Sequence, residues 1–439
     1  MTVFVVIVGV VAVLALLGLV HRWLWVRLVR DTTRPGGPAR RAGTVLAFAL
    51  PLLSLAALTA GRAGAPFWLQ RLVAWPGFMW LAVLLYLTLA MLVAEPVRRL
   101  WLRRLNRTVP AGPGPAPIGV PDTPAGRGTA PRGPAATAAR AAPEADTAEA
   151  PAAPAGQGAG DGPAGVTRRV FVARTLGGAA VAAAGVTVGN GTYGVLRGPR
   201  VKRVQVPLAH LPRAAHGFRI AVVSDVHLGP VLGRAHTRRI VDTVNRTQPD
   251  LIAIVGDLVD GNVHDLGPAA EPLRQLRARH GSFFVTGNHE YFSGARQWVD
   301  HVRELGLTPL ENARRELPHF DLAGVNDVQG EKEGEGPDFQ AALGDRDRSR
   351  TSVLLAHQPV VIHDAVRHGV DLQLSGHTHG GQLWPGNYLA ELANPTVAGL
   401  ERYGDTQLYV SRGAGAWGPP VRVGAPSDIT VVELASYQS

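Results

Sequence analysis

Three long apolar runs interrupt the polar pattern at the beginning of the chain. They cover residues 2–20, about 45–60 and about 75–94, and arginine residues flank them. About 20 consecutive apolar residues are enough for a helix to cross the hydrocarbon core of a bilayer. The second run is the least regular because it is short and contains Pro51. We therefore expect a transmembrane region of about three helices over residues 1–107 rather than helices buried in a soluble core.

The segment 108–166 has no apolar periodicity. It consists mainly of Ala, Pro and Gly with scattered charges, and it contains no aromatic residue. Such a composition buries too little apolar surface to offset the entropy that is lost on ordering. The pattern predicts a disordered linker between the membrane region and the rest of the chain.

A further apolar segment follows this linker. Arg168 and Arg169 stand between Thr167 and Phe171, and a run of small apolar residues extends from there to about residue 188. This order resembles a twin-arginine export signal, although such signals usually stand at an N-terminus. The alternative is an ordinary fourth membrane span with arginines on its cytoplasmic side. Residues 167–199 are therefore predicted to be a signal or a fourth span, and both interpretations place the following domain outside the cytoplasm.

Short apolar runs alternate with helical patterns through residues 200–439. Strands are predicted at residues 218–223, 251–255, 282–286, 353–356, 372–374, 407–410 and 429–434. Helices are predicted at about residues 234–246, 268–279 and 295–305. The charged segment 330–350 is expected to be a surface loop. This alternation predicts an α/β fold with parallel strands.

The distribution of charge supports the membrane interpretation and argues against a nucleic-acid-binding protein. The net charge is +10, but residues 1–199 hold 20 Lys and Arg against 7 Asp and Glu, whereas residues 200–439 hold 24 against 27. The basic excess next to the apolar runs indicates cytoplasmic loops, so we expect the N-terminus and the C-terminal domain outside the cytoplasm. No nucleic-acid partner is expected, since the globular half has no basic excess. The absence of cysteine excludes disulfides, thiolate zinc sites and a cysteine nucleophile.

Four polar clusters and one isolated histidine carry the candidate chemistry. Together they supply seven candidate metal ligands: Asp225, His227, Asp257, Asn288, His357, His377 and His379. The first three clusters each follow a short apolar run, and parallel strands deliver such residues to one edge of a sheet. Oxygen and imidazole ligands without a thiolate suit Mn, Fe or Zn. Two such ions side by side hydrolyse phosphate esters in many enzymes by making hydroxide available near neutral pH.

Each cluster taken alone has an ordinary structural explanation. Asp225 and His227 would most often mark a surface turn, and His357 would most often be a core or capping histidine. The pair His377 and His379 is more specific, because two histidines among glycines have little use in packing. The joint occurrence of all clusters, in this order after predicted strands, favours a metal site.

The order of the clusters resembles the calcineurin-like metallophosphoesterase superfamily, and in particular a bacterial branch that is membrane-linked or exported by the twin-arginine route. The resemblance covers about residues 218–434 and rests on the segments 287–290, 376–382 and 411–426. Glu290 stands where much of the superfamily has Asp, as is common in that branch. The resemblance implies a four-layer α-β-β-α sandwich with metals at the carboxyl ends of the strands.

The resemblance also implies a role for each candidate residue. One metal would be held by Asp225, His227, Asp257 and His379, and the other by Asp257, Asn288, His357 and His377. His289 would be the catalytic residue: not a ligand, it would give a proton to the departing oxygen. Glu290 would not contact the metals itself but would orient His289 or a ligand histidine.

These observations predict a membrane-anchored, extracytoplasmic, metal-dependent phosphoesterase. Its substrate would be a diester or a phosphate linked to a lipid or to the cell envelope, and the twin-arginine translocase is a candidate partner. The alternatives are a phosphomonoesterase, a pyrophosphatase of the UDP-diacylglucosamine type, and a non-catalytic metal-binding scaffold of the envelope. Trp384 and Trp417, in loops near the last clusters, would line an apolar cleft suited to a lipid-linked substrate or would simply pack within their loops.

Overall fold

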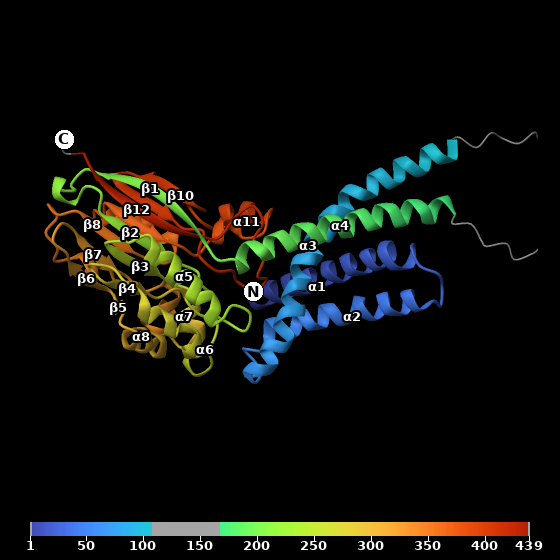
Figure 1. Cartoon of the computed structure of the whole chain (residues 1–439), viewed down its shortest axis with the longest axis horizontal. Helices are drawn as coiled ribbons and strands as arrows, with labels where there is room; N and C mark the ends of the chain where they lie inside the picture. The colour runs from blue at the N-terminus through green and yellow to red at the C-terminus, as the bar shows by residue number, and fades with distance from the viewer. Residues whose placement is uncertain (1, 108–166, 438–439) are drawn as a thin grey trace, which may run out of the picture.

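The computed structural model describes residues 2–107 and 167–437, which form a bundle of long helices beside a domain built on two β-sheets (Figure 1). The predicted linker, residues 108–166, lies outside the described residues.

Four helices are long and apolar enough, by length and composition, to cross a membrane. They are α1 (Thr2–Trp25), which continues into the π-helical turn η1 (Val26–Arg30), α2 (Pro38–Thr59), α3 (Phe67–Arg107) and α4 (Arg168–Leu196). Both α2 and α3 are longer than the apolar runs that indicated them, and α2 continues through Pro51. Most of the exposed large apolar side chains among the described residues lie on these helices. Such outward-facing apolar surface is typical of helices that contact lipid.

The two ends of the helical bundle differ. Figure 1 shows the turn between α1 and α2, the end of α3 and the start of α4 at the end far from the β-sheets. At this end the Arg174 side chain donates to the Thr32 carbonyl at 2.9 Å, and Arg27 pairs with Glu95 at 2.9 Å. The domain adjoins the other end, where α4 leads through a short turn into the first strand. The Arg168 and Arg169 pair stands in the first turn of α4, which fits either interpretation of this segment, and the export route stays a prediction.

The domain contains two six-stranded sheets, each with a parallel centre. The first has the strand order β1 (Arg200–Leu208), β12 (Asp428–Ser436), β2 (Arg219–Val223), β3 (Leu251–Val255), β4 (Ser282–Val285) and β5 (Thr308–Pro309). The second has the order β10 (Gly399–Tyr403), β11 (Thr406–Val410), β9 (Leu372–Ser375), β8 (Ser352–Leu355), β7 (Asp321–Gly324) and β6 (Ala313–Glu316). Strands β2 to β5 run parallel, as do β7, β8, β9 and β11.

Helices cover the outer faces of both sheets, which confirms the predicted four-layer α-β-β-α sandwich. They are α5 (Arg234–Arg246), α6 (Val263–Ala270), α7 (Asn288–Ser293), α8 (Ala295–Glu304), α9 (Phe339–Leu343) and α10 (Ile362–Arg367). Helix α11 (Gly386–Ala393) has no buried residue and packs against the turn that follows β9. The core between the sheets includes Val222 and Leu355. A second core lies under α5 and α8, with Ile240 and Trp298, and a third lies under α9 and α10. Short 3₁₀ turns complete the domain: η2 (Arg213–Ala215), η3 (Glu271–Gln275), η4 (Val328–Glu333), η5 (Pro359–Val361) and η6 (His379–Gly381).

Two of the expected elements differ from the structure. The helix expected at 268–279 is not present as such: α6 ends at Ala270 and a 3₁₀ turn follows over Glu271–Gln275. Helix α6 begins at Val263 because Asn262 caps it by accepting from the Asp265 amide at 2.9 Å. The segment 330–350 is not simply a surface loop. It contains α9, whose Phe339 and Leu343 are buried in the third core.

Candidate metal centre

The carboxyl ends of parallel strands from both sheets bring the predicted ligands together. Asp225, Asp257 and Asn288 follow β2, β3 and β4. His357 and His377 follow β8 and β9 of the other sheet in the same way. Backbone hydrogen bonds link these loops to one another, for example from the Asp225 amide to the Gly256 carbonyl at 3.1 Å. The two sheets therefore converge on one site, as the strand pattern predicted.

Most of these ligand positions have an unusual backbone conformation. Positive φ angles occur at Asp225 (52°), His227 (49°), Asp257 (53°), His377 (73°) and His379 (53°). Residues other than glycine rarely adopt this region, and each instance costs roughly 1–3 kcal/mol. Such strain persists where the surroundings fix a side chain for a function. Gly256 permits the tight approach, because a Cβ there would lie 2.7 Å from the Gly287 amide and from His357 Nδ1.

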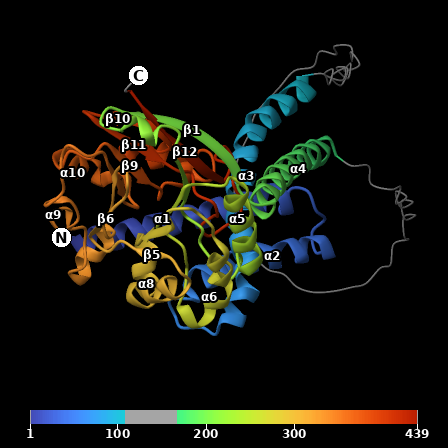
Figure 2. The same cartoon turned by 60° about the vertical axis from the view of Figure 1, so that its left-hand side comes forward.

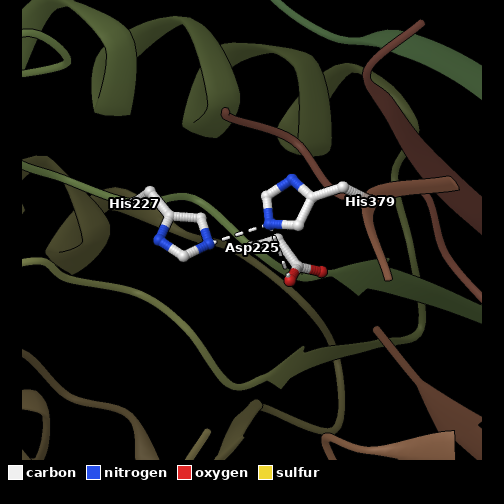
Figure 3. A group of neighbouring side chains, drawn as sticks. All are labelled: Asp225, His227 and His379. Carbon is white, nitrogen blue, oxygen red and sulfur yellow. Dashed lines mark hydrogen bonds and ion pairs between the residues drawn. The ribbon is translucent and has the colours of Figure 1, made fainter. Parts of the chain in front are cut away.

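Asp225, His227 and His379 form the first group of donor atoms (Figure 3). His227 Nε2 and His379 Nε2 lie 2.9 Å apart, and His379 Nε2 lies 3.4 Å from Asp225 Oδ1. Figure 3 shows the two rings directed toward each other with the carboxylate of Asp225 beside them. All three side chains are buried.

Asp257, His357 and His377 form the second group. His357 Nε2 lies 3.1 Å from Asp257 Oδ2, and His377 Nδ1 lies 3.0 Å from Asn288 Oδ1. Asn288 thereby joins the second group through the oxygen that could serve as a ligand.

Asp257 connects the two groups. Its Oδ2 atom lies 3.6 Å from His227 Nε2 and 3.1 Å from His357 Nε2. A carboxylate has two oxygens and can contact one cation on each side. The structure therefore brings all seven predicted ligand residues together, with Asp257 in the central position.

The donor set fits divalent metal ions on physical grounds. His357 Nδ1 lies 2.8 Å from the Val255 carbonyl and so carries a hydrogen, which leaves Nε2 facing the carboxylate of Asp257. At 3.1 Å these two atoms repel each other unless a proton or a metal ion stands between or beside them. His357 Nε2 is buried and has no hydrogen-bond partner among the described residues. Oxygen and imidazole nitrogen are the ligands that Mn, Fe and Zn accept.

The electrostatics of the site also favour the binding of cations. Burial opposes the charged form of His227, but Asp260, Asp257 and Asp225 outweigh it and raise the pKa of His227 to about 9. The carboxylates raise the pKa of the buried His357 in the same way. Burial and then the charge of Arg422 hold the pKa of His379 well below its ordinary value, so this ring is neutral, the form that binds metals. The site attracts positive charge, which metal ions can supply.

Asp260 is a functional residue that sequence reasoning missed. Its Oδ1 atom lies 2.6 Å from His289 Nδ1 and 3.1 Å from His227 Nδ1. Burial opposes its charge, but both histidines outweigh that effect and lower the pKa of Asp260 to about 2. The carboxylate thus orients a predicted ligand and the predicted catalytic residue together. Its position three residues after Asp257 was the only signal in the sequence.

Glu290 has a different role from the one expected. Its carboxylate accepts from the backbone amides of Asp257 at 2.9 Å, Leu258 at 2.8 Å and Gly287 at 2.6 Å. Burial, and then the Asp257 charge, raise its pKa to about 7. Glu290 therefore ties the loop after β3 to the loop after β4, and it orients backbone rather than a histidine ring.

His289 points into the site from the first turn of α7. Its backbone amide donates to Asp257 Oδ1 at 2.9 Å, and its Nε2 lies 4.0 Å from Asp257 Oδ2. The ring packs against two aromatic side chains, Phe292 with ring centres 5.5 Å apart and Trp417 at 5.8 Å. His289 thus stands beside the central carboxylate with one nitrogen held by Asp260 and the other directed inward.

Comparisons with known proteins agree with this geometry. Residues 218–381 match the family described as calcineurin-like phosphoesterase. The chain is 39% identical over 250 residues to the "Transmembrane protein with metallophosphoesterase domain" of Danio rerio, covering 54% of this chain and 57% of that protein. It is 39% identical to an uncharacterized metallophosphoesterase of Helicobacter pylori, over 56% of this chain and 66% of that protein. An uncharacterized metallophosphoesterase of Aquifex aeolicus is 34% identical over 54% of this chain and 91% of its own length.

Proposed function

Because the chain belongs to the calcineurin-like phosphoesterase family, we propose that it is a membrane-anchored hydrolase that cleaves phosphate esters with two divalent metal ions. One observation carries the proposal: the buried carboxylate of Asp257 lies between two groups of donor atoms. Such sharing is what a pair of ions about 3.5–4 Å apart requires.

In this proposal each ion has four protein ligands. The first set is Asp225, His227, Asp257 and His379, and the second is Asp257, Asn288, His357 and His377. The short distances within each set support the assignment, as does the position of His357 Nε2, which faces Asp257. When bound, Mn, Fe or Zn ions would supply Lewis acidity and activated water near neutral pH.

His289 is the proposed general acid. Asp260 at 2.6 Å from Nδ1 holds the ring in one orientation and leaves Nε2 directed toward the metal site. From there Nε2 gives its proton to the departing oxygen as the ester bond breaks. A positioned acid of this kind typically contributes about 10²–10⁴-fold in rate.

The catalytic domain is proposed to lie outside the cytoplasm. The arginine-rich turn between α1 and α2, the end of α3 and the start of α4 lie at one end of the bundle, and the domain lies at the other (Figure 1). Arginine-rich ends of membrane helices stay in the cytoplasm. The phosphate ester is then a diester, or a phosphate carried by a lipid or by the cell envelope.

Two substitutions test the metal assignment and the acid separately. His289→Ala should keep its metal content and lose turnover by about 10²–10⁴-fold, since only the proton donor is removed. Asp257→Ala should lose both ions and all measurable turnover. The full chain in nanodiscs is analysed for metal by mass spectrometry and assayed with p-nitrophenyl phosphate and bis-p-nitrophenyl phosphate, with and without added Mn.

Three results would count against the proposal. Full metal content without hydrolysis of either ester would favour a non-catalytic metal-binding protein. Two retained ions in Asp257→Ala would remove this residue from the central position. Equal loss of metal and turnover in His289→Ala would make His289 a ligand rather than an acid.

A further inference from the structure

Several exposed apolar side chains of the domain lie around α11 and the metal centre. Among the described residues beyond 200, exposed large apolar side chains include Phe292, Trp384, Tyr388, Leu389, Leu392 and Trp417. Helix α11 contributes Leu389, which is 72% exposed, and Leu392, which is 85% exposed. This helix has no buried residue. Exposure on this scale marks a contact surface rather than scattered surface residues.

This surface adjoins the membrane helices directly. The hydroxyl of Tyr86, inside the apolar run of α3, donates to the Trp384 carbonyl at 3.0 Å. The backbone at Val421 and Arg422 packs against Gly191 of α4, where a Cβ would lie 2.7 Å from Val421 Cγ1. Leu383 and Val423 belong to the same apolar cluster as Tyr86. The segment that leads into α11 and the backbone near Val421 therefore pack against α3 and α4.

Helix α11 and Arg422 also contact the turn that carries His379, one of the candidate metal ligands. A Cβ on Gly381, in the turn that carries His379, would overlap the backbone of Asn387 in the first turn of α11. Arg422, whose backbone amide donates to Gly191 at 3.3 Å, places its guanidinium 3.0 Å from both the carbonyl and Nδ1 of His379. The structure thus joins α4, the His379 turn and α11 through direct contacts.

Two exposed aromatic side chains flank the proposed general acid. Trp417 is 50% exposed and Phe292 is 57% exposed, and both rings pack against the His289 ring. Gln382 holds the Trp417 loop, because its amide donates to the Trp417 carbonyl at 2.9 Å and accepts from the Trp417 amide at 3.0 Å. Gly418, the next residue, lies beside Phe78 of α3. The side of the site from which His289 acts is thereby apolar and next to the membrane helices.

We propose that α11, Trp384 and Trp417 rest in the surface of the bilayer that holds α1–α4, and that the substrate is a phosphate ester borne by a membrane lipid. The inference rests on the proposed function and names its substrate class. The lipid enters from the side with its phosphate at the metal centre and its apolar part along Trp417 and α11. Water adds its oxygen to phosphorus, the ester bond breaks, and His289 gives its proton to the leaving oxygen.

The position of α11 is tested with single cysteines, because the natural chain contains none. Leu392→Cys and the control Val366→Cys carry a fluorescent label in full-length protein in nanodiscs made with brominated phosphatidylcholine. Val366 is exposed and lies on α10, which Figure 2 shows on the opposite side of the domain from α4. Strong quenching at 392 with none at 366 is expected. Equal quenching at both positions, or none at 392, would overturn the bilayer contact, including the case in which a second copy of the chain covers α11.

The substrate class is tested with matched esters. Wild-type protein in nanodiscs should hydrolyse a long-chain lipid, dioleoyl phosphatidic acid or dioleoyl phosphatidylglycerol, about tenfold faster than its dihexanoyl homologue. The combined change Leu389→Asp and Leu392→Asp should lower long-chain hydrolysis about tenfold while bis-p-nitrophenyl phosphate hydrolysis falls by much less. The matched change Val366→Asp should alter neither. The two long-chain lipids distinguish a monoester from a diester.

The two proposals fail in different ways. Loss of hydrolysis with every ester, in fully metallated protein, would contradict the proposed function. Normal hydrolysis of bis-p-nitrophenyl phosphate with no preference for the long chain would leave that function standing and overturn the lipid substrate. An equal fall with all esters in the α11 variant would mean that α11 only supports the His379 turn.

Discussion

Two buried clusters of charge, one in each half of the molecule, are balanced in opposite ways. In the domain, Asp225 and Asp257 face histidines, and their negative field is left for cations to complete. In the helical bundle, Glu95 is also buried, though less completely, and it accepts from Arg27 at 2.9 Å and Arg98 at 2.8 Å. The chain itself supplies the positive charge in the second cluster.

This difference shows that burial of a carboxylate alone does not indicate a ligand site. A buried charge must be paired, and the partner's identity tells whether the pairing is complete. Arginine is permanently charged, so Arg27 and Arg98 neutralise the charge of Glu95 within the fold. The histidines beside Asp225 and Asp257 can exchange a proton for a metal ion, because a neutral imidazole offers a lone pair. The first cluster can therefore accept cations, whereas the second joins α3 to η1, the continuation of α1.

Among the substitutions that test this comparison, Asp260→Asn is expected to have the largest effect on turnover, and it tests the metal cluster. An amide keeps the shape of the side chain but lacks the charge that orients the rings of His227 and His289. Turnover should fall by about 10–100-fold, and metal should bind more weakly through His227. Steady-state kinetics at saturating metal and a metal titration measure both effects.

Asp265→Asn is the matched control, because Asp265 pairs only with the exposed cap of α6 among the contacts described. Its kinetics should equal those of the natural chain. Normal turnover with unchanged metal affinity in Asp260→Asn would show that Asp260 does not position either histidine.

Glu95→Gln tests the charge cluster of the helical bundle. The substitution leaves Arg27 and Arg98 without their buried partner, and breaking such a pair costs about 3–5 kcal/mol. The free energy of unfolding of the full chain in detergent, followed by circular dichroism, should fall accordingly. Metal content and turnover per folded molecule should stay unchanged. A loss of metal with unchanged stability would mean that the two clusters are not independent.

The metal ligands could be predicted from the sequence for a physical reason. Asp225, Asp257 and Asn288 each follow a short buried strand, so local pattern alone places them at a common edge. Asp260 lies in a loop whose path depends on contacts with His227 and His289, which no periodicity reveals. Sequence pattern therefore predicted that the candidate ligands gather at one edge, but it did not predict that Asp260 lies beside them.

The contact between domain and membrane helices could not be predicted either. Apolar periodicity shows that a helix has a lipid-facing surface, but it does not show which residues meet a neighbouring domain. The meeting of Gly191 with Val421 depends on the absence of a side chain at one position of α4. The strand β1 was also missed, because its exposed charged residues hide the pairing of Arg200–Leu208 with β12.

The smallest effect is expected at His236. This buried histidine has no hydrogen-bond partner for either ring nitrogen among the described residues. It lies on α5, where burial first and then the charges of Arg239 and Arg422 lower its pKa to about 3. The folded chain keeps this histidine neutral, whereas the unfolded chain takes up a proton below about pH 6.5. Stability is therefore lost as the pH falls from about 6.5 toward 3.

His236→Leu removes this titration, so its stability should decline less steeply with acid than that of the natural chain. Between pH 7 and pH 5 the two free energies of unfolding should converge by about 2 kcal/mol, from about 1.4 kcal/mol for each pH unit below 6.5. Thermal denaturation at both pH values measures the difference, and His264→Leu, at an exposed position of α6, should follow the natural chain. Parallel pH dependence of His236→Leu and the natural chain would show that His236 is protonated alike in both states. Burial without a partner would then not suppress the charge of a side chain in this protein. The contrast between Asp257 and Glu95 depends on that premise and would lose its physical basis.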